Sequence, residues 1–180
     1  MKKAMVSAIA GLLALSVSAQ TRKPAPAAQN GAGALQGEPA TPADQAFSVL
    51  VHKSAGLQFR LQNLIPEAQS KGSAGTTLFN YGRYNMQLSV RTISGGAEVH
   101  AHWDDVMIVE QGAATLLTGG TVVGGQTDAA GETKGVKIEG GQSQTIAPGD
   151  IVTVPAGTPH QILLGPNVIY GAVVIKIYTR

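Results

Sequence analysis

The stretch 149-GDIVTVPAGTPH-160 joins an apolar strand pattern to a tight turn and a histidine. Gly149 precedes the strand, and 155-PAG-157 predicts a turn, because proline presets φ and glycine tolerates a positive φ. His160 follows where the next strand is expected to begin. The stretch therefore predicts two strands joined by a turn, with an imidazole at the start of the second strand.

Similar short runs, rich in Val, Ile, Thr and Leu, continue over residues 75–180 and are separated by glycine pairs and Pro-Gly. Several runs alternate with period two, as strands with one buried face do. Many short strands with glycine-rich turns predict an all-β sandwich or closed barrel. The polar segment 124–135 is interpreted as a solvated hairpin tip. The expected strands are 76–79, 85–93, 97–102, 105–110, 113–117, 121–123, 136–138, 143–146, 150–154, 161–164 and 168–178.

The N-terminal part of the chain has a different character. Residues 1–19 carry two lysines, an apolar run of about 14 residues and the small residues Val17-Ser18-Ala19, which predicts a cleaved export signal. A transmembrane anchor is the alternative, but crossing a bilayer takes about 20 residues. Export would place the protein in the periplasm or the medium. Because the chain has no cysteine, disulfides and a lipid-modified N-terminal cysteine are excluded.

Two further segments precede the β region. Residues 20–40 are rich in Pro, Ala and Gly and are predicted to form a flexible linker. Residues 41–74 are predicted to be a partly helical extension: Leu57, Leu61, Leu64 and Ile65 recur at helical spacing from Ser54, and the pattern ends near Lys71-Gly72. Thr41 to Val51 fit either a capped helix or a strand.

The charge balance limits the kinds of partner. The whole chain has 13 basic and 11 acidic residues, so that removal of Lys2 and Lys3 with the signal leaves 11 of each. Nucleic acids and anionic membrane surfaces demand a basic field. The mature protein is therefore expected to bind neither of them, and a small molecule is the expected ligand.

A second stretch, 98-EVHAHWDDVMIVEQG-112, holds two of the four histidines. In a regular strand, residues i and i+2 point to the same face, so His100 and His102 are expected to project together. Asp105 follows three residues later, where a turn would return its carboxylate to the same point. With His160, these residues form a ligand set suited to Fe, Mn, Co, Ni, Cu or Zn. A polar strand end in water is the alternative for the pair alone.

The stretch that contains His160 carries a family resemblance. Gly149, Pro155, Gly157 and His160 match the second motif of the cupin superfamily, a glycine followed by five residues and PxGxxH. The chain resembles cupins over about residues 85–178. The resemblance implies a double-stranded β-helix, the cupin jelly-roll barrel, with a metal inside the barrel. The short helical extension predicted from the leucine spacing would precede this barrel.

The first cupin motif is matched less regularly. The family has HxH, then a carboxylate after three or four residues, and a glycine after six more; His100, His102, Asp105 and Gly112 take these positions. The resemblance implies a metal ion bound by His100, His102, Asp105 and His160. Only two residues separate His102 from Asp105, and an aspartate replaces the usual glutamate. Asp104 or a water molecule therefore remains an alternative fourth ligand.

Residues around the motifs give further expectations. Arg91 and Tyr84 are candidates for catalysis. Arg91 belongs to a polar set that alternates with apolar residues and faces either the barrel mouth or solvent; the set is Asn85, Gln87, Ser89 and Arg91. If the set lines the mouth, Arg91 would pair with a substrate carboxylate. Trp103 is expected to face away from the metal. Lys176 is interpreted as an edge-strand charge that blocks unwanted pairing.

These observations lead to one principal functional hypothesis and two alternatives. The principal hypothesis is an exported metal-dependent cupin enzyme with one divalent transition metal. It would act on a small organic acid, sugar derivative or aromatic compound by dioxygenase, decarboxylase or isomerase chemistry. The first alternative is a barrel that binds a small ligand without turnover, and the second is a structural oligomerisation unit. The resemblance also implies a homodimer.

Overall fold

A computed structural model describes residues 49–179 of the 180-residue chain. The predicted signal peptide, the predicted linker and the first part of the 41–74 extension, including the possible Thr41 cap, lie outside the described residues. Val49 to Lys53 have no regular secondary structure. The part of the Thr41 to Val51 stretch that the structure describes is therefore not a strand. Within residues 49–179, no helix combines the length and apolar character needed to cross a membrane.

The helix α1 covers Ser54–Lys71 and confirms the helical pattern of the extension. It ends at Gly72, which adopts the left-handed conformation and donates its N–H to the carbonyl of Ala68 at 2.7 Å. Leu61 and Ala68 are buried against the outer face of a sheet. The apolar stripe of α1 is thus explained by packing on the β domain.

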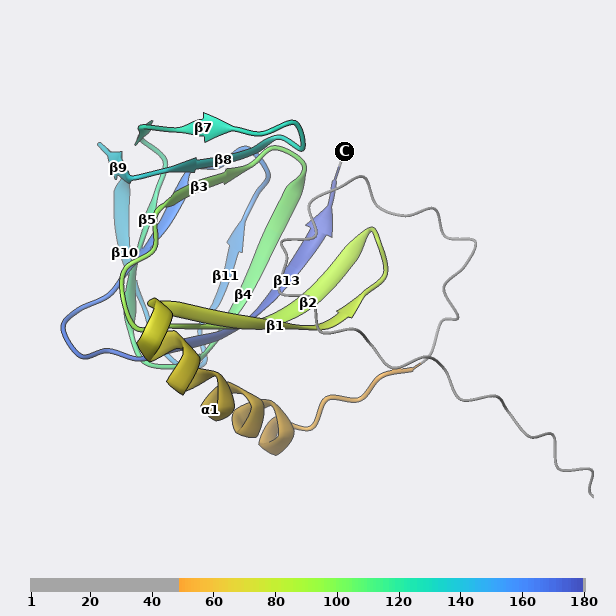
Figure 1. Cartoon of the computed structure of the whole chain (residues 1–180). Helices are drawn as coiled ribbons and strands as arrows, with labels where there is room; N and C mark the ends of the chain where they lie inside the picture. The colour runs from red at the N-terminus through yellow and green to blue at the C-terminus, as the bar shows by residue number, and fades with distance from the viewer. Residues whose placement is uncertain (1–48, 180) are drawn as a thin grey trace, which may run out of the picture. The chain divides into compact units, whose positions relative to one another are not determined.

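Thirteen strands follow α1 among the described residues and form two main sheets (Figure 1). The five-stranded sheet has the order β1-β2-β13-β4-β11, and the six-stranded sheet has the order β10-β5-β12-β3-β8-β7. A small sheet pairs β6 with β9. The bounds are β1 Ser73–Asn80, β2 Tyr84–Arg91, β3 Ala97–His100, β4 Trp103–Gln111, β5 Ala114–Thr118, β6 Thr121–Val123, β7 Gln126–Thr127, β8 Glu132–Gly135, β9 Lys137–Glu139, β10 Gln142–Ile146, β11 Ile151–Val154, β12 His160–Leu163 and β13 Tyr170–Tyr178.

The main core lies between the two sheets. The five-stranded sheet contributes Met107, Val109 and Val174 among others, and the six-stranded sheet contributes Leu116 and Ile162. A second core lies between α1 and the outer face of the five-stranded sheet. Antiparallel strands in two facing sheets, with one helix on the outside, confirm the predicted all-β jelly-roll with a short helical extension.

The pairing of β2 with β13 shows which way the polar set of β2 faces. Asn85 lies opposite Lys176 and Gln87 opposite Val174, a residue of the inner core. Directly paired residues share a face of the sheet, so the polar set faces the interior of the barrel. The alternating Leu88 faces α1. This rules out the outward solvated face for these residues.

Two expectations about single segments are wrong. Lys176 is not at a sheet edge, because β13 lies between β2 and β4 in the middle of its sheet. The segment 124–135 is not merely a solvated tip, since it contains β7 and β8, and its Glu132 is 3% exposed. Both residues belong to the site described next.

Candidate metal centre

The six-stranded sheet places four ionisable side chains on one face. Glu98 of β3 lies opposite His160 of β12, and His100 lies two residues further along β3. Glu132 of β8 lies opposite His100. Directly paired residues and residues two apart share a face, so these side chains gather on the inner side of the sheet. His100, Glu132 and His160 are buried.

The five-stranded sheet contributes Asp105 and Lys176 from the opposite side. Asp105 of β4 pairs in register with Lys176 of β13 and with Val154 of β11. The ammonium Nζ of Lys176 donates to Asp105 Oδ1 at 2.7 Å. The side chain of Asp105 is 7% exposed and that of Lys176 is 19% exposed. The two sheets therefore converge on one polar cluster inside the barrel.

The ligand atoms of this cluster lie close together. Asp105 Oδ2 is 3.3 Å from His100 Nε2 and 3.8 Å from His160 Nε2. Glu98 Oε2 is 3.8 Å from His100 Nε2. Glu98, His100 and His160 each offer one ligand atom, and these three atoms lie within 4.8 Å of one another. This is a His/Glu cluster that could hold a metal ion.

Each imidazole of the cluster is oriented through its other nitrogen. His100 Nδ1 contacts the Glu132 carboxylate, and His160 Nδ1 lies 3.1 Å from the carbonyl oxygen of Thr158. Carboxylate and carbonyl oxygens accept, so each Nδ1 is the donor, and in the neutral imidazole Nε2 then carries the lone pair. His100 Nε2 is buried and has no hydrogen-bond partner. An oriented imidazole with a free Nε2 is the arrangement found at metal-binding histidines.

The cluster also shifts the pKa values of its members. Burial alone would raise the pKa of Asp105, but the neighbouring His100 and the Lys176 ammonium lower it to about 2. Burial lowers the pKa of His160. Burial would also lower the pKa of His100, but the adjacent Asp105 and Glu132 carboxylates outweigh it and raise the pKa. At neutral pH the cluster therefore contains an ionised Asp105 and a neutral His160, the forms that bind metals.

The structure does not bring His102 into this cluster. β3 ends at His100, Ala101 and His102 form a bend, and β4 begins at Trp103 in the other sheet. The rule that residues i and i+2 share a face therefore fails at this point. The His102 ring lies 6.1 Å from the ring of Tyr178, and its Nε2 lies next to Gly131.

The same change of sheet decides the orientation of the next residues. Trp103 is buried and shares a face with Asp105, so the expectation that it points away from the site is wrong. Its ring packs edge-on against Tyr178, with ring centroids 5.1 Å apart. Asp104 points the other way and accepts a hydrogen bond from the Ala156 N–H at 2.7 Å. Of the two aspartates, Asp105 is the one in the cluster.

The two candidates for catalysis lie apart from the cluster. Tyr84 is at the end of β2 that lies near the cluster, because it pairs with Ile177, next to Lys176. Its side chain points to the outer side of the sheet, where it is 41% exposed and packs against Phe79. Arg91 faces inward but pairs with Tyr170 at the far end of β13. Six residue steps along the strand separate the Arg91 row from the row of Asn85 and Lys176, which is about 20 Å. Arg91 is therefore too far away to bind a group held at the cluster.

Glu98 and Glu132 are the members of the cluster that sequence reasoning missed. Glu98 stands two residues before His100, a spacing that could have indicated a shared strand face. Glu132 comes 32 residues after His100 in a polar glycine-rich segment, and nothing in its neighbourhood marks it as buried. Only the pairing of β3 with β8 brings it to His100.

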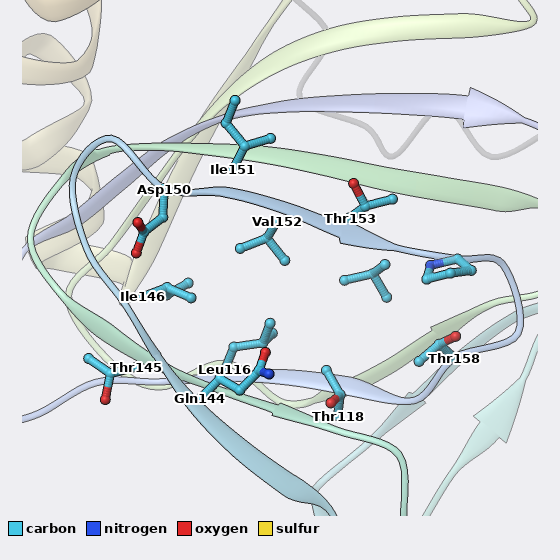
Figure 2. A pocket seen from close by; sticks show the side chains of 12 residues that line it. Leu116, Thr118, Gln144, Thr145, Ile146, Asp150, Ile151, Val152, Thr153 and Thr158 are labelled. Carbon is cyan, nitrogen blue, oxygen red and sulfur yellow. The ribbon is translucent and has the colours of Figure 1, made fainter.

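A cavity of about 710 Å³ opens where the edge strands β10 and β11 of the two sheets face each other (Figure 2). Figure 2 shows Leu116, Ile146 and Val152 pointing toward one another into the cavity, whereas Ile151 and Thr153 point away. None of the cluster residues lines the cavity. Its lining ends at Val154 and Thr158, which are neighbours of the cluster in the fold.

Among known proteins, the chain is similar only to solved structures. No family model and no curated protein matches the chain. A cupin superfamily protein from Desulfitobacterium hafniense DCB-2 is 18% identical over 59% of this chain and 77% of that chain, with a TM-score of 0.41. A predicted oxalate decarboxylase from Thermotoga maritima is 12% identical over 59% and 80% of the two chains, with a TM-score of 0.44. KdgF from a Halomonas species is 17% identical over 61% and 82%, with a TM-score of 0.42. With its own two-sheet topology and its polar cluster inside the barrel, the chain has a cupin fold.

Proposed function

We propose that this protein is an exported, metal-dependent cupin enzyme that acts on a small organic acid, sugar derivative or aromatic compound. The observation that supports the proposal most strongly is the orientation of the two buried imidazoles. Both place Nε2 beside Asp105 Oδ2, while Nδ1 is engaged by Glu132 or by the Thr158 carbonyl. Such preorganised nitrogens beside a carboxylate fit a divalent transition metal: Fe, Mn, Ni, Cu, Co or Zn.

The charges of the cluster support the same proposal. Glu98, Asp105 and Glu132 bring three carboxylates to the interior of the barrel, and Lys176 is the cation that contacts one of them. Buried charges require compensation. A divalent cation would compensate carboxylate charge in the cluster beyond the one that Lys176 contacts.

The residues around the cluster would divide the work of holding the ion. His100, His160 and Asp105 would bind it, and Glu132 and Thr158 orient the imidazoles. Lys176 adds to the effect of His100 in lowering the pKa of Asp105. A bound transition metal supplies Lewis-acid polarisation or, for a redox-active ion, electron exchange, which divides isomerase or decarboxylase chemistry from dioxygenase chemistry. Half-buried Asn85 and Gln87 of β2 face the interior and provide polar groups for a small substrate.

The test is elemental analysis of protein purified without chelators or a metal-affinity tag. We expect about one transition-metal ion per chain, lost on chelation together with part of the thermal stability. His160→Ala should abolish metal binding. His52→Ala is the matched control, because His52 stacks on Phe79 outside the cluster. Wild-type protein that binds no divalent metal, and is equally stable with and without chelator, would disprove metal dependence.

A non-catalytic binding module is the second candidate, and the cavity between β10 and β11 favours it. The cavity has an aliphatic interior with threonine, glutamine and Asp150 groups around it, and the cluster residues do not line it. A ligand with an apolar body and polar groups at its edge fits such a lining. Thermal stabilisation by a ligand that is recovered unchanged, and that Val152→Trp abolishes without loss of metal, would favour binding over turnover.

Export and a homodimeric state are also proposals. Export is supported by the lysines and apolar run of residues 1–19. Cell fractionation with N-terminal sequencing should find a mature chain that begins near Gln20 outside the cytoplasm. Size-exclusion chromatography with light scattering should give twice the mature mass, and a monomer would contradict the dimer.

A further inference from the structure

We infer that Glu98, rather than His102, is the partner of His100 in the metal centre, so that the ion is bound by Glu98, His100, Asp105 and His160. This inference rests on the proposed function, because it assumes that the cluster holds a metal. It replaces an expected set of three imidazoles and one carboxylate by two imidazoles and two carboxylates. His102 is then a packing residue.

The position of Glu98 is determined by the register of the six-stranded sheet. Glu98 lies directly opposite His160 and two residues before His100 on β3. All three side chains therefore point to the inner face, and their ligand atoms come within 4.8 Å of one another. The side chain of Glu98 is 31% exposed, whereas that of His100 is 6% exposed. Glu98 thus forms the solvent-facing side of the site.

His102 is held in a different environment. The chain crosses from one sheet to the other at Ala101 and His102, and both residues are tied by their backbones: Ala101 N–H donates to Gly131 O at 3.0 Å, and His102 O accepts from Thr179 N–H at 2.9 Å. The ring packs between Tyr178 and Gly131. These backbone hydrogen bonds fix the point from which the His102 side chain projects, outside β3 and beside Gly131.

The spacing of the first motif supports the same assignment. With His100 and His102 as the pair, only two residues precede Asp105, fewer than the three or four of the cupin pattern. With Glu98 and His100 as the pair, the residues before Asp105 are 101–104, four in number, and Gly112 still follows after six. The pattern is therefore regular, with a glutamate at the position of the first histidine. With this assignment, the gap before the Asp105 ligand is no longer shorter than in the cupin pattern.

The other polar contacts of the cluster leave one oxygen of Asp105 for the ion and engage Glu132 elsewhere. Lys176 engages Asp105 Oδ1 and leaves Oδ2, which faces both imidazoles. Glu132 is engaged by His100 Nδ1. A centre with two carboxylate oxygens is harder than one with three imidazoles, and carboxylates suit Mn and Mg better than Cu or Zn. We therefore expect Mn²⁺ or Fe²⁺ to bind better here, relative to Cu²⁺ and Zn²⁺, than in a three-imidazole site.

The experiment is a titration of metal-free mature protein with Mn²⁺, followed by electron paramagnetic resonance and calorimetry. Glu98→Gln keeps the size of the side chain and removes its charge, and it should weaken Mn²⁺ binding at least tenfold, roughly the loss that removal of a metal-supporting group produces. His102→Gln is the matched control and should change the affinity by less than about twofold. Circular dichroism and the unfolding midpoint of each metal-free variant check that it is folded.

A third variant keeps the inference testable if Glu98→Gln fails to fold. Glu98→His recreates a three-imidazole set and should increase the Zn²⁺ to Mn²⁺ affinity ratio by about tenfold or more. The inference would be overturned if His102→Gln lost Mn²⁺ binding while Glu98→Gln kept it, or while Glu98→His left the Zn²⁺ to Mn²⁺ affinity ratio unchanged. Either result would leave the proposed function standing. Wild-type protein that binds no metal would overturn both.

Discussion

Lys176 Nζ donates to Asp105 Oδ1 at 2.7 Å across the middle of the five-stranded sheet. The pair faces the barrel interior, where Asp105 Oδ2 meets two imidazoles. A lysine that would be interpreted as an edge-strand charge thus contributes, after His100, to the lowered pKa of the carboxylate most central to the site. The stability of the empty site and its ability to bind a metal should both depend on this contact.

Lys176→Met should destabilise the metal-free protein by about 2 kcal/mol, because it leaves the buried Asp105 carboxylate without its cation. The expected cost is below the range for fully buried pairs, since Lys176 is partly exposed. Urea unfolding at neutral pH measures the effect. Lys137→Met is the control: Lys137 pairs with Glu139 on the surface and should change stability by about 0–1 kcal/mol. Equal effects of the two substitutions would contradict the prediction.

The stability of the metal-free protein should depend on pH through Asp105. Its pKa is lowered to about 2 in the folded protein, below the unfolded value. The unfolded chain therefore binds the proton first on acidification, and the stabilisation is complete above about pH 4. It is lost as the pH falls from about 4 to about 2.

This contribution should amount to about 2 kcal/mol. Asp105→Asn should flatten the stability profile over that range, as measured by urea unfolding at successive pH values. Asp128→Asn, in the exposed part of the β7–β8 segment, is the comparison and should leave the profile unchanged. An Asp105→Asn profile as steep as that of the wild type would show that other carboxylates determine the acid sensitivity.

Glu132→Gln should weaken metal binding by about 10–100-fold without removing a ligand. The substitution removes the charged acceptor that orients His100 through Nδ1. Calorimetric titration of the metal-free variant with Mn²⁺ or Zn²⁺ measures the loss. Glu139→Gln, at an exposed position of β9, should bind like the wild type. Unchanged affinity in Glu132→Gln would mean that the imidazole is positioned by packing alone.

The two motif glycines should differ in their tolerance of alanine. Gly112 and Gly149 both have positive φ, 67° and 96°. A Cβ on Gly112 would lie 2.3 Å from the Ile169 carbonyl oxygen, whereas one on Gly149 meets nothing within 4 Å. Gly149→Ala should therefore cost only the conformational strain, about 1 kcal/mol, and Gly112→Ala clearly more. Denaturant midpoints test the order, and a larger loss for Gly149→Ala would contradict it.

Much of the fold could be predicted because its signals are local. The spacing of Leu57, Leu61 and Leu64 follows from the geometry of one helix turn, and α1 was found where this pattern predicted it. The glycines and Pro155 mark turns through their backbone preferences, so most strands were also predicted. The prediction that Lys176 lies on an edge strand was wrong, because the sequence of a strand does not show which strands will lie beside it in the sheet.

The sequence by itself determined the β character of the domain, its helical extension, and the presence of His100, Asp105 and His160 as candidate ligands, since periodicity and turn chemistry act over a few residues. The tertiary structure alone decided that the chain changes sheet after His100, that Glu98 lies opposite His160, and that Glu132 reaches His100. These relations depend on the register of strands distant in sequence. Hydrogen bonding and burial across the whole barrel select that register.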